Sequence, residues 1–113
     1  MTFGDIVLVP FPFADKDQSE LHPAVVITEI HLGNSSDLIL SMISSNISRC
    51  TNEDVLIDDK DEEFAVTKLA VKSCIKTGKV ATVSRIRIQR KLGRLGSKHH
   101  QEFANKLRAR LKL

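Results

Sequence analysis

Residues 4–13 read GDIVLVPFPF and hold the first strand of the fold that the sequence predicts. Positions 6–9 are apolar and mostly β-branched, in a run that is too short and too apolar for a surface helix. Pro10 and Pro12 follow at once, and a proline lacks the backbone N–H that a strand ladder uses. We therefore predict a short buried strand near the N-terminus and a loop after it.

The same signals recur along the chain as far as residue 83. The turn residues 33–36, with the sequence GNSS, favour antiparallel pairing of the strands on either side of them. Two polar stretches, 14–21 and the acidic run 58–63, are predicted to be exposed connections. Apolar runs bounded by turn residues predict further strands at residues 24–30, 38–43, 54–57, 64–67, 69–75 and 80–83.

After residue 84 the pattern changes to that of a C-terminal helix. Ser97 is a candidate N-cap, because its hydroxyl can accept a hydrogen bond from a free N–H of the first turn. Phe103, Leu107 and Leu111 recur every fourth residue, which places them on one stripe of a helix. This stripe predicts a helix that packs on the strands before it.

The order of these elements predicts the fold class. Gly93 and Gly96 are interpreted as ending a short helix before the one that Ser97 starts. Several short strands followed by terminal helix are typical of a mainly β fold with C-terminal α structure. We predict a small SH3-like barrel closed by a helix, with residues 1–113 forming a single domain.

The formal net charge of +3 hides an uneven distribution of charge along the chain. Residues 1–67 hold three Lys/Arg against thirteen Asp/Glu, whereas residues 68–113 hold fourteen Lys/Arg against Glu102 alone. The basic half is electrostatically suited to bind a polyanion. The two halves can equally neutralise one another in the folded domain and leave a solvated helix face, so both interpretations stay open.

Cys50 and Cys74 are isolated, without a CxxC pattern or histidines at ligand spacing. We interpret them as buried or half-buried thiols rather than as a disulfide or a zinc site. His99 and His100 would point about a hundred degrees apart on a helix, and we assign both to the surface. No metal ion or cofactor is expected.

The sequence holds no run of about eighteen apolar residues, the length that a membrane-spanning helix needs. Its N-terminus also lacks the basic region and apolar run of an export signal. We therefore expect a soluble cytoplasmic protein that contacts no membrane.

Five stretches of the chain, taken in order, resemble the PemK/MazF family of toxin endoribonucleases from toxin–antitoxin pairs. They are residues 4–13, 23–27, 43–46, 72–76 and 90–95, and they span almost the whole chain. The resemblance implies an SH3-like barrel and a homodimer with an RNA groove at its interface. It also implies metal-independent cleavage of single-stranded mRNA at a short sequence, and neutralisation by a cognate antitoxin with an acidic tail.

The resemblance places catalysis on His22 and Ser44. RNA is cut by its own 2'-hydroxyl when a base removes the proton, a cation stabilises the phosphorane and the leaving 5'-oxygen is protonated. Members of the family carry an arginine before the proline that opens the second strand, and a threonine or serine that ends the third. This chain has His22 in place of the arginine and Ser44 in place of the hydroxyl residue.

Histidine at position 22 can be interpreted in opposite ways. It lacks the permanent charge and the planar fork with which arginine holds a phosphate, so the protein would be a weakened nuclease. Histidine also titrates near neutral pH and can therefore transfer protons itself. A third interpretation is that His22 is an ordinary turn residue.

The matching stretches also predict an RNA-binding surface. An amide such as that of Asn46 can read a base edge, and the guanidinium of Arg49 can stack on a base or hold a phosphate. Lys72 and Lys76, four apart on a strand, should point to one face. A solvated sheet face is the alternative for the two lysines. The predicted RNA-binding residues are Phe13, Ser45, Asn46, Arg49, Lys72, Ser73 and Lys76.

Three functions remain compatible with the sequence. The first is an active endoribonuclease toxin, which the order of the motifs favours. The second is a member of the same fold that binds RNA or a partner and has lost the reaction. The third is a toxin directed at DNA gyrase, although the terminal features that define such toxins are not evident in this chain.

Overall fold

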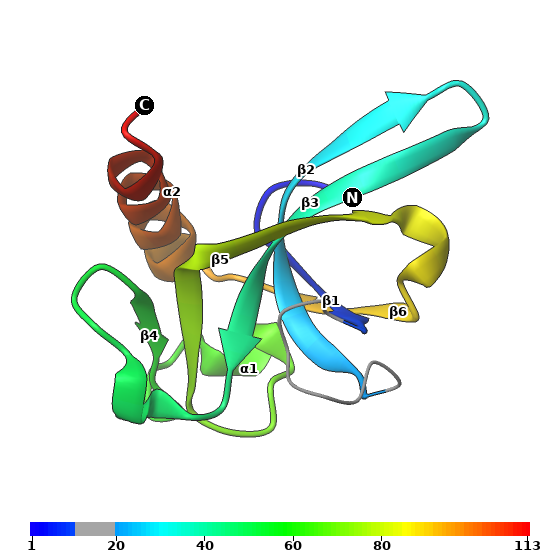
Figure 1. The fold of residues 1–113 in the computed structure, drawn as a ribbon. Coiled ribbons are helices and arrows are strands. Elements are labelled where there is room, and N and C mark those ends of the chain that lie inside the picture. The colour runs from blue at the N-terminus through cyan, green and yellow to red at the C-terminus, as the bar shows by residue number, and fades with distance from the viewer. Residues whose placement is uncertain (11–19) are drawn as a thin grey trace.

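The computed structural model describes residues 1–10 and 20–113, and within them six antiparallel strands form one sheet in the order β4-β5-β3-β2-β1-β6 (Figure 1). The strands are β1 Asp5–Val9, β2 His22–Leu32, β3 Ser35–Ser44, β4 Val55–Ile57, β5 Ser73–Ser84 and β6 Arg90–Arg94. The helical elements are η1 Ile47–Arg49, α1 Phe64–Thr67, η2 Arg85–Arg87 and α2 Ser97–Leu111. The predicted mainly β fold with a C-terminal helix is confirmed. The predicted loop at residues 14–21 lies largely outside the described residues.

Long strands give the sheet its shape. β2 and β3 form an antiparallel hairpin, as predicted, and its far end projects from the rest of the molecule (Figure 1). Gly33 turns the chain there with a positive φ of 66°, a conformation that glycine adopts without steric cost. The register shifts between Val26 and Thr28 and again between Ser41 and Ile43, and such bulges increase the local twist of a sheet.

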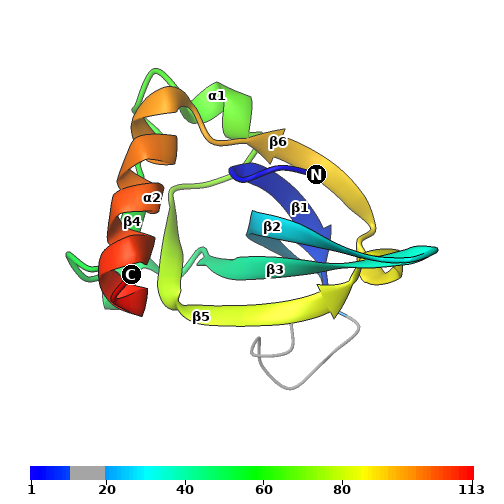
Figure 2. The same ribbon diagram turned by 90° about the horizontal axis from the view of Figure 1, so that it is seen from above.

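The sheet buries apolar side chains on both of its faces. On one face Ile6 and Val25 belong to a cluster that includes Phe103 of α2. On the other face Val7 and Ala24 belong to a second cluster. Successive side chains of a strand point to opposite faces, so the continuous apolar runs in β1 and β2 reflect strands that are covered on both sides (Figure 2).

The carboxylate of Asp54, directly before β4, joins three elements in the interior. It is 1% exposed and accepts hydrogen bonds from the Lys76 ammonium at 2.9 Å and from the backbone N–H of Thr77 at 3.2 Å, both on β5. The guanidinium of Arg110 on α2 lies 3.5 Å from it. Burial disfavours the ionised form, but the bonds from Lys76 and from the N–H of Thr51 outweigh burial and lower the pKa of Asp54 to about 2.

Three strands of the second half differ from the prediction. Residues 64–67 form the short helix α1, because the backbone turns on itself and the N–H of Lys68 donates to the carbonyl of Ala65. A short apolar run cannot be distinguished from a buried helical turn by its periodicity. Residues 69–72, predicted as strand, lie before β5. Residues 73–75 and 80–83, predicted to belong to two strands, are both parts of the single strand β5.

The segment before α2 also differs from the prediction. Residues 90–94 form β6 rather than a helix, and Gly93 is needed there because a Cβ would overlap the carbonyl group of Thr67 in α1. The helix is capped by Glu63 rather than by Ser97, since the Glu63 carboxylate accepts from the N–H of Lys98 at 2.9 Å.

The side chains of α2 follow the predicted stripe only in part. Phe103 and Leu107 are buried, whereas Leu111 is exposed at the end of the helix. The assignment of both histidines to the surface is wrong for His99, which is 1% exposed because it precedes Phe103 by four residues, while His100 is exposed. Among the described residues, no helix has both the length and the apolar composition for crossing a bilayer.

Ion pairs join the acidic and basic halves of the chain. Glu29 on β2 pairs with Arg85 at 2.8 Å and accepts a hydrogen bond from Ser36 at 2.7 Å. The Ser36 hydroxyl, the N-terminal ammonium and Arg85 together lower the pKa of Glu29 to about 2. The pairs Lys91 with Asp5 and Lys98 with Asp61 join the halves as well, so mutual neutralisation accounts for a large part of the charge asymmetry.

We expect Asp54→Asn to lower the free energy of unfolding at pH 7 by about 2 kcal/mol, because Lys76 and Arg110 lose their buried anion. The pKa of Asp54 is depressed in the folded state, so its contribution is present above its unfolded pKa and is lost as pH falls from about 4 to about 2. Urea unfolding at a series of pH values should therefore show a shallower acid dependence in Asp54→Asn. Glu53→Gln removes a neighbouring carboxylate that is 66% exposed, and it serves as the control.

Candidate functional site

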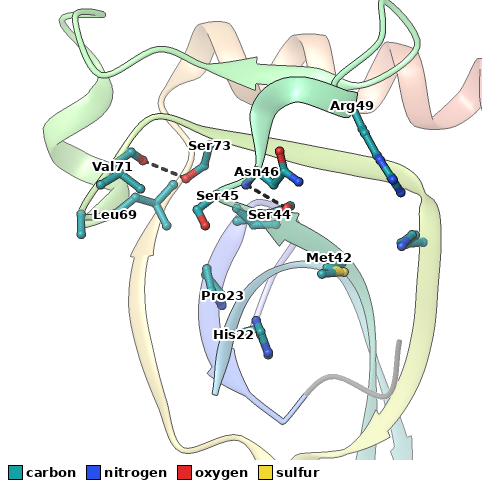
Figure 3. A pocket seen from close by; sticks show the side chains of 13 residues that line it. His22, Pro23, Met42, Ser44, Ser45, Asn46, Arg49, Leu69, Val71 and Ser73 are labelled. Carbon is teal, nitrogen blue, oxygen red and sulfur yellow. Dashed lines mark hydrogen bonds between the residues drawn. The ribbon is translucent and has the colours of Figure 1, made fainter. Parts of the chain in front are cut away.

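A cavity of about 610 Å³ opens where the start of β2, the end of β3 and the segment before β5 meet. Figure 3 shows His22 and Pro23 on one side of it, Leu69, Val71 and Ser73 on another, and Asn46 and Arg49 on a third. Among the described residues that line it, Arg49 and Lys79 are cationic and none is Asp or Glu. The cavity is therefore suited to an anion. The full lining is His22, Pro23, Met42, Ile43, Ser44, Ser45, Asn46, Arg49, Leu69, Ala70, Val71, Ser73 and Lys79.

His22 and Ser44 reach the cavity because their strands are neighbours. Ala24 of β2 pairs with Met42 of β3, and the two strands run antiparallel. His22, two positions before Ala24, and Ser44, two positions after Met42, therefore lie at the same end of the strand pair. Side chains two apart on a strand share a face, so His22 and Ser44 lie on one side of the sheet. The pairing of β2 with β3 thus brings both predicted catalytic residues to one place.

The His22 ring is half-buried, with 25% of its side chain exposed. Its Nε2 atom is buried and has no hydrogen-bond partner among the described residues. The carboxylate of Glu20 lies 3.8 Å from this atom, beyond hydrogen-bond distance. His22 thus lines the cavity with a ring whose Nε2 atom the fold buries and leaves without a partner among the described residues.

Local hydrogen bonds order the end of β3. The hydroxyl of Ser44 accepts a hydrogen bond from the backbone N–H of Asn46 at 3.1 Å, which leaves its own hydrogen free to donate. The carbonyl oxygen of the Asn46 side chain accepts from the N–H of Ser48 at 3.2 Å and from its hydroxyl at 2.6 Å. The amide NH₂ group of Asn46 has no partner among the described residues, and it can donate to a bound molecule.

The loop that carries Arg49 is tied to β5 through Lys76. The Lys76 ammonium donates to the backbone carbonyl of Arg49 at 2.8 Å and to Asp54 at 2.9 Å. Its charge is thus largely used inside the protein. The side chains of Arg49 and Lys79 are exposed and form no ion pair with the described residues, and both also line an adjoining cavity of about 240 Å³.

The structure brings most of the predicted site residues together. His22, Ser44, Ser45, Asn46, Arg49 and Ser73 line one cavity, and Lys76 lines the adjoining one. Ser73 uses its hydroxyl to donate to the carbonyl of Val71 at 2.8 Å.

Two of the predicted RNA-binding residues do not join this group. Lys72 lies outside both cavity linings, because β5 begins only at Ser73, and its ammonium is 3.9 Å from Asp58. The predicted pair of Lys72 and Lys76 on one strand face is therefore wrong. Phe13 lies outside the described residues.

Lys79 is the charged residue of this site that the sequence interpretation missed. It follows Gly78 in the middle of β5, where the sequence analysis placed a break between two strands. In a continuous strand, positions 73 and 79 are six apart and therefore share a face. A prediction of one long strand would have put Lys79 on the same face as Ser73.

The interpretation of the cysteines as free thiols is wrong, because Cys50 and Cys74 form a disulfide with a Cα–Cα distance of 5.9 Å. They are 24 residues apart, and the η1 turn and the β3–β5 pairing bring them together. Their sulfurs and a carboxylate oxygen of Asp54 lie within 4.8 Å of one another. With the sulfurs bonded to each other, this group offers no thiolate to a metal.

Comparisons with known proteins agree with the fold. A family model for the PemK-like, MazF-like toxin of type II toxin–antitoxin systems matches residues 2–111. An endoribonuclease in complex with its cognate antitoxin from Mycobacterial species is 12% identical, with a TM-score of 0.73 over 100% of this chain and 96% of that one.

Two further solved structures share the fold. Mycobacterium tuberculosis toxin MazF-mt6 is 17% identical, with a TM-score of 0.71 over 96% of this chain and 97% of that one. An endoribonuclease from Mycobacterial species is 13% identical, with a TM-score of 0.68 over 100% and 92% of the two chains. A comparison with curated proteins gave no match.

The family match covers nearly the whole chain, and the fold agrees with it. The chain belongs to the PemK-like, MazF-like family of toxins from type II toxin–antitoxin systems.

Proposed function

We propose that this chain is a metal-independent, sequence-specific endoribonuclease that cleaves single-stranded mRNA by attack of the RNA's own 2'-hydroxyl. The observation that carries this proposal is the convergence of His22 and Ser44 in one cavity, whose cations are Arg49 and Lys79 and whose described lining holds no carboxylate. An RNA phosphate needs a cationic pocket without competing anions. Membership in the toxin family supports the same conclusion.

In the proposed reaction the 2'-oxygen bonds to the adjacent phosphorus while the bond from phosphorus to the 5'-oxygen breaks. His22 takes the 2'-proton on an imidazole nitrogen and then gives a proton to the leaving 5'-oxygen. The products are a 2',3'-cyclic phosphate and a free 5'-hydroxyl, and the histidine returns to its starting state.

Ser44, Arg49 and Lys79 stabilise the charge that develops on the phosphorane. The Ser44 hydroxyl donates to a non-bridging oxygen while its own oxygen accepts from Asn46. Arg49 and Lys79, which are exposed, hold the reacting phosphate or its neighbours. Ser45, Asn46 and Ser73 line the cavity where RNA bases and sugars would contact the protein, and Lys76 lines the adjoining one. The proposal keeps Phe13 and Lys72 as further RNA contacts on the ground of the family resemblance alone.

The assembly that we propose is a cytoplasmic homodimer with an RNA groove at its interface. A cognate antitoxin would block that groove with an acidic tail, because an anionic segment that orders as it binds competes with RNA for the same cations. Residues 1–113 would act as a single domain in each protomer.

The proposal is tested by incubating the purified protein with a long single-stranded RNA in excess chelator and mapping the ends. We expect cuts at one short sequence that leave a 2',3'-cyclic phosphate and a 5'-hydroxyl. RNA that binds and stays intact would identify a binding protein without nuclease activity. Cleavage that requires a divalent ion would contradict the mechanism.

We expect His22→Ala to lower the rate of cleavage about a hundredfold while it keeps most of the RNA affinity, since proton transfer belongs to the transition state. If His22 transfers the proton, the wild-type rate should depend on pH, and His22→Arg should remove that dependence. His31→Ala changes an exposed histidine elsewhere on β2 and is the matched control. An unchanged rate and pH profile in His22→Ala would assign His22 a structural role.

We expect Arg49→Ala and Lys79→Ala to weaken RNA binding and to reduce its salt dependence by about 0.7 in log–log slope for each RNA phosphate that the variant no longer neutralises. Arg87→Ala removes an exposed cation from η2, outside the cavity, and should leave the slope unchanged. Titrations of a labelled RNA at several salt concentrations measure the slope. Equal slopes in all four proteins would show that the RNA phosphates lie elsewhere.

A further inference from the structure

We propose that Cys50 and Cys74 form a reversible redox-modification site that controls the cavity through the loop of residues 46–50. The co-reactant is a low-molecular-weight thiol or disulfide that exchanges with the protein disulfide. This inference rests on the proposed function, since the loop carries Asn46 and Arg49. The disulfide-bonded protein is the form with the higher affinity for RNA.

The disulfide lies directly behind the cavity. Cys50 follows Arg49 and Cys74 follows Ser73, and both of those neighbours line the cavity. On β5, Cys74 is paired with Ser44 of β3, so the bond ties the loop to the strand beside the proposed catalytic hydroxyl. A change in the covalent state therefore acts next to Arg49 and Ser73 in the sequence and across the strand pair from Ser44.

Few other contacts hold this loop. The η1 turn has no buried residue, and Ile47, its apolar side chain, is 38% exposed. The hydrogen bonds of Asn46 join residues within the loop and its immediate neighbour Ser44. Beyond them, the bond from Lys76 to the carbonyl of Arg49 ties the loop to β5. Because burial contributes so little here, the disulfide and the bond from Lys76 are the two contacts that hold the loop against β5.

The rest of the connection is held independently of the disulfide. Asp54 accepts from the N–H of Thr51 at 3.1 Å and from Lys76 and Thr77 on β5. Lys106 on α2 donates to the carbonyl of Asp54 at 2.9 Å. Reduction should therefore loosen residues 46–50 and leave β4, β5 and α2 in place.

The exchange reaction balances with a dithiol as reductant. A thiolate of the dithiol attacks Sγ of Cys50, which is half-buried, and the bond to Sγ of the fully buried Cys74 breaks. Cys74 leaves as a thiolate and takes up a proton. The second thiol of the reagent then attacks the mixed disulfide, so that Cys50 is released as a thiol and the reagent becomes a cyclic disulfide. Oxidised glutathione reverses the reaction.

The redox state of the compartment decides which form of the protein is present and therefore how active the proposed nuclease is. In a reducing cytoplasm Cys50 and Cys74 are kept as thiols, and an oxidant converts them to the disulfide. The disulfide fixes the loop before RNA binds, so that less conformational entropy is lost when RNA contacts the loop. Oxidation would thus raise the activity of the proposed nuclease.

The experiment compares the full-length protein after treatment with oxidised glutathione and after treatment with dithiothreitol, always in chelator because of the three candidate ligand atoms near Asp54. Alkylation and intact mass report the state of the thiols. We expect cleavage at low RNA concentration to be about tenfold faster in the oxidised protein, mainly through KM. Cys50→Ser should cleave RNA at the rate of the reduced protein, and neither reagent should change that rate. Cys74→Ala provides a second test should the serine variant fold poorly.

Hydrogen exchange separates this inference from the proposed function. Reduction should speed amide exchange at residues 46–50 and leave β4 and α2 unchanged, whether or not RNA is cut. RNA left intact in both states would refute the nuclease and leave the redox site to be judged by exchange alone. Equal exchange and equal cleavage in two states of verified thiol content, or failure of the disulfide to form, would overturn the redox proposal.

Discussion

The buried carboxylate of Asp54 is the interaction on which the second half of the structure depends. It binds Lys76 and Thr77 of β5 and Arg110 of α2, and it also closes the turn that begins at Thr51. A buried anion is tolerated only when several donors surround it, so these elements must meet in one arrangement. Lys76 then carries the constraint outward, since the same ammonium holds the carbonyl of Arg49 at the cavity.

The family resemblance predicted His22 and Ser44 as site residues, and pairing between neighbouring strands explains why they meet. His22 opens β2 and Ser44 ends β3, and the GNSS turn at residues 33–36 already predicted that these strands pair. Once two strands are paired in register, the relative positions of their ends follow. Ser45 and Asn46 come with Ser44 for the same reason, and the fold class follows from the order of strands and helix.

Features set by interactions between distant segments could not be predicted in this way. The disulfide joins residues 24 apart, and neither cysteine carries a local signal for it. Lys79 was missed because Gly78 resembles a break in a strand, whereas β5 continues through it. The burial of His99 depends on which face of α2 the sheet covers. In α1 and β6, packing between Thr67 and Gly93 decides the conformation of short segments whose own preferences are weak.

Position 22, where the family resemblance leads one to expect arginine, shows how these constraints meet in the proposed function. With His22 in that place the cavity gains a proton-transfer group and loses a fixed cation, so Arg49 and Lys79 must supply the positive charge. Lys79 lies on β5, which pairs with β3 on one side and β4 on the other. Arg49 lies on a loop whose position depends on Lys76 and on the bond between Cys50 and Cys74. The cation that would replace the family arginine is thus the one whose placement can change, and this is why we expect redox control to act on RNA binding rather than on stability alone.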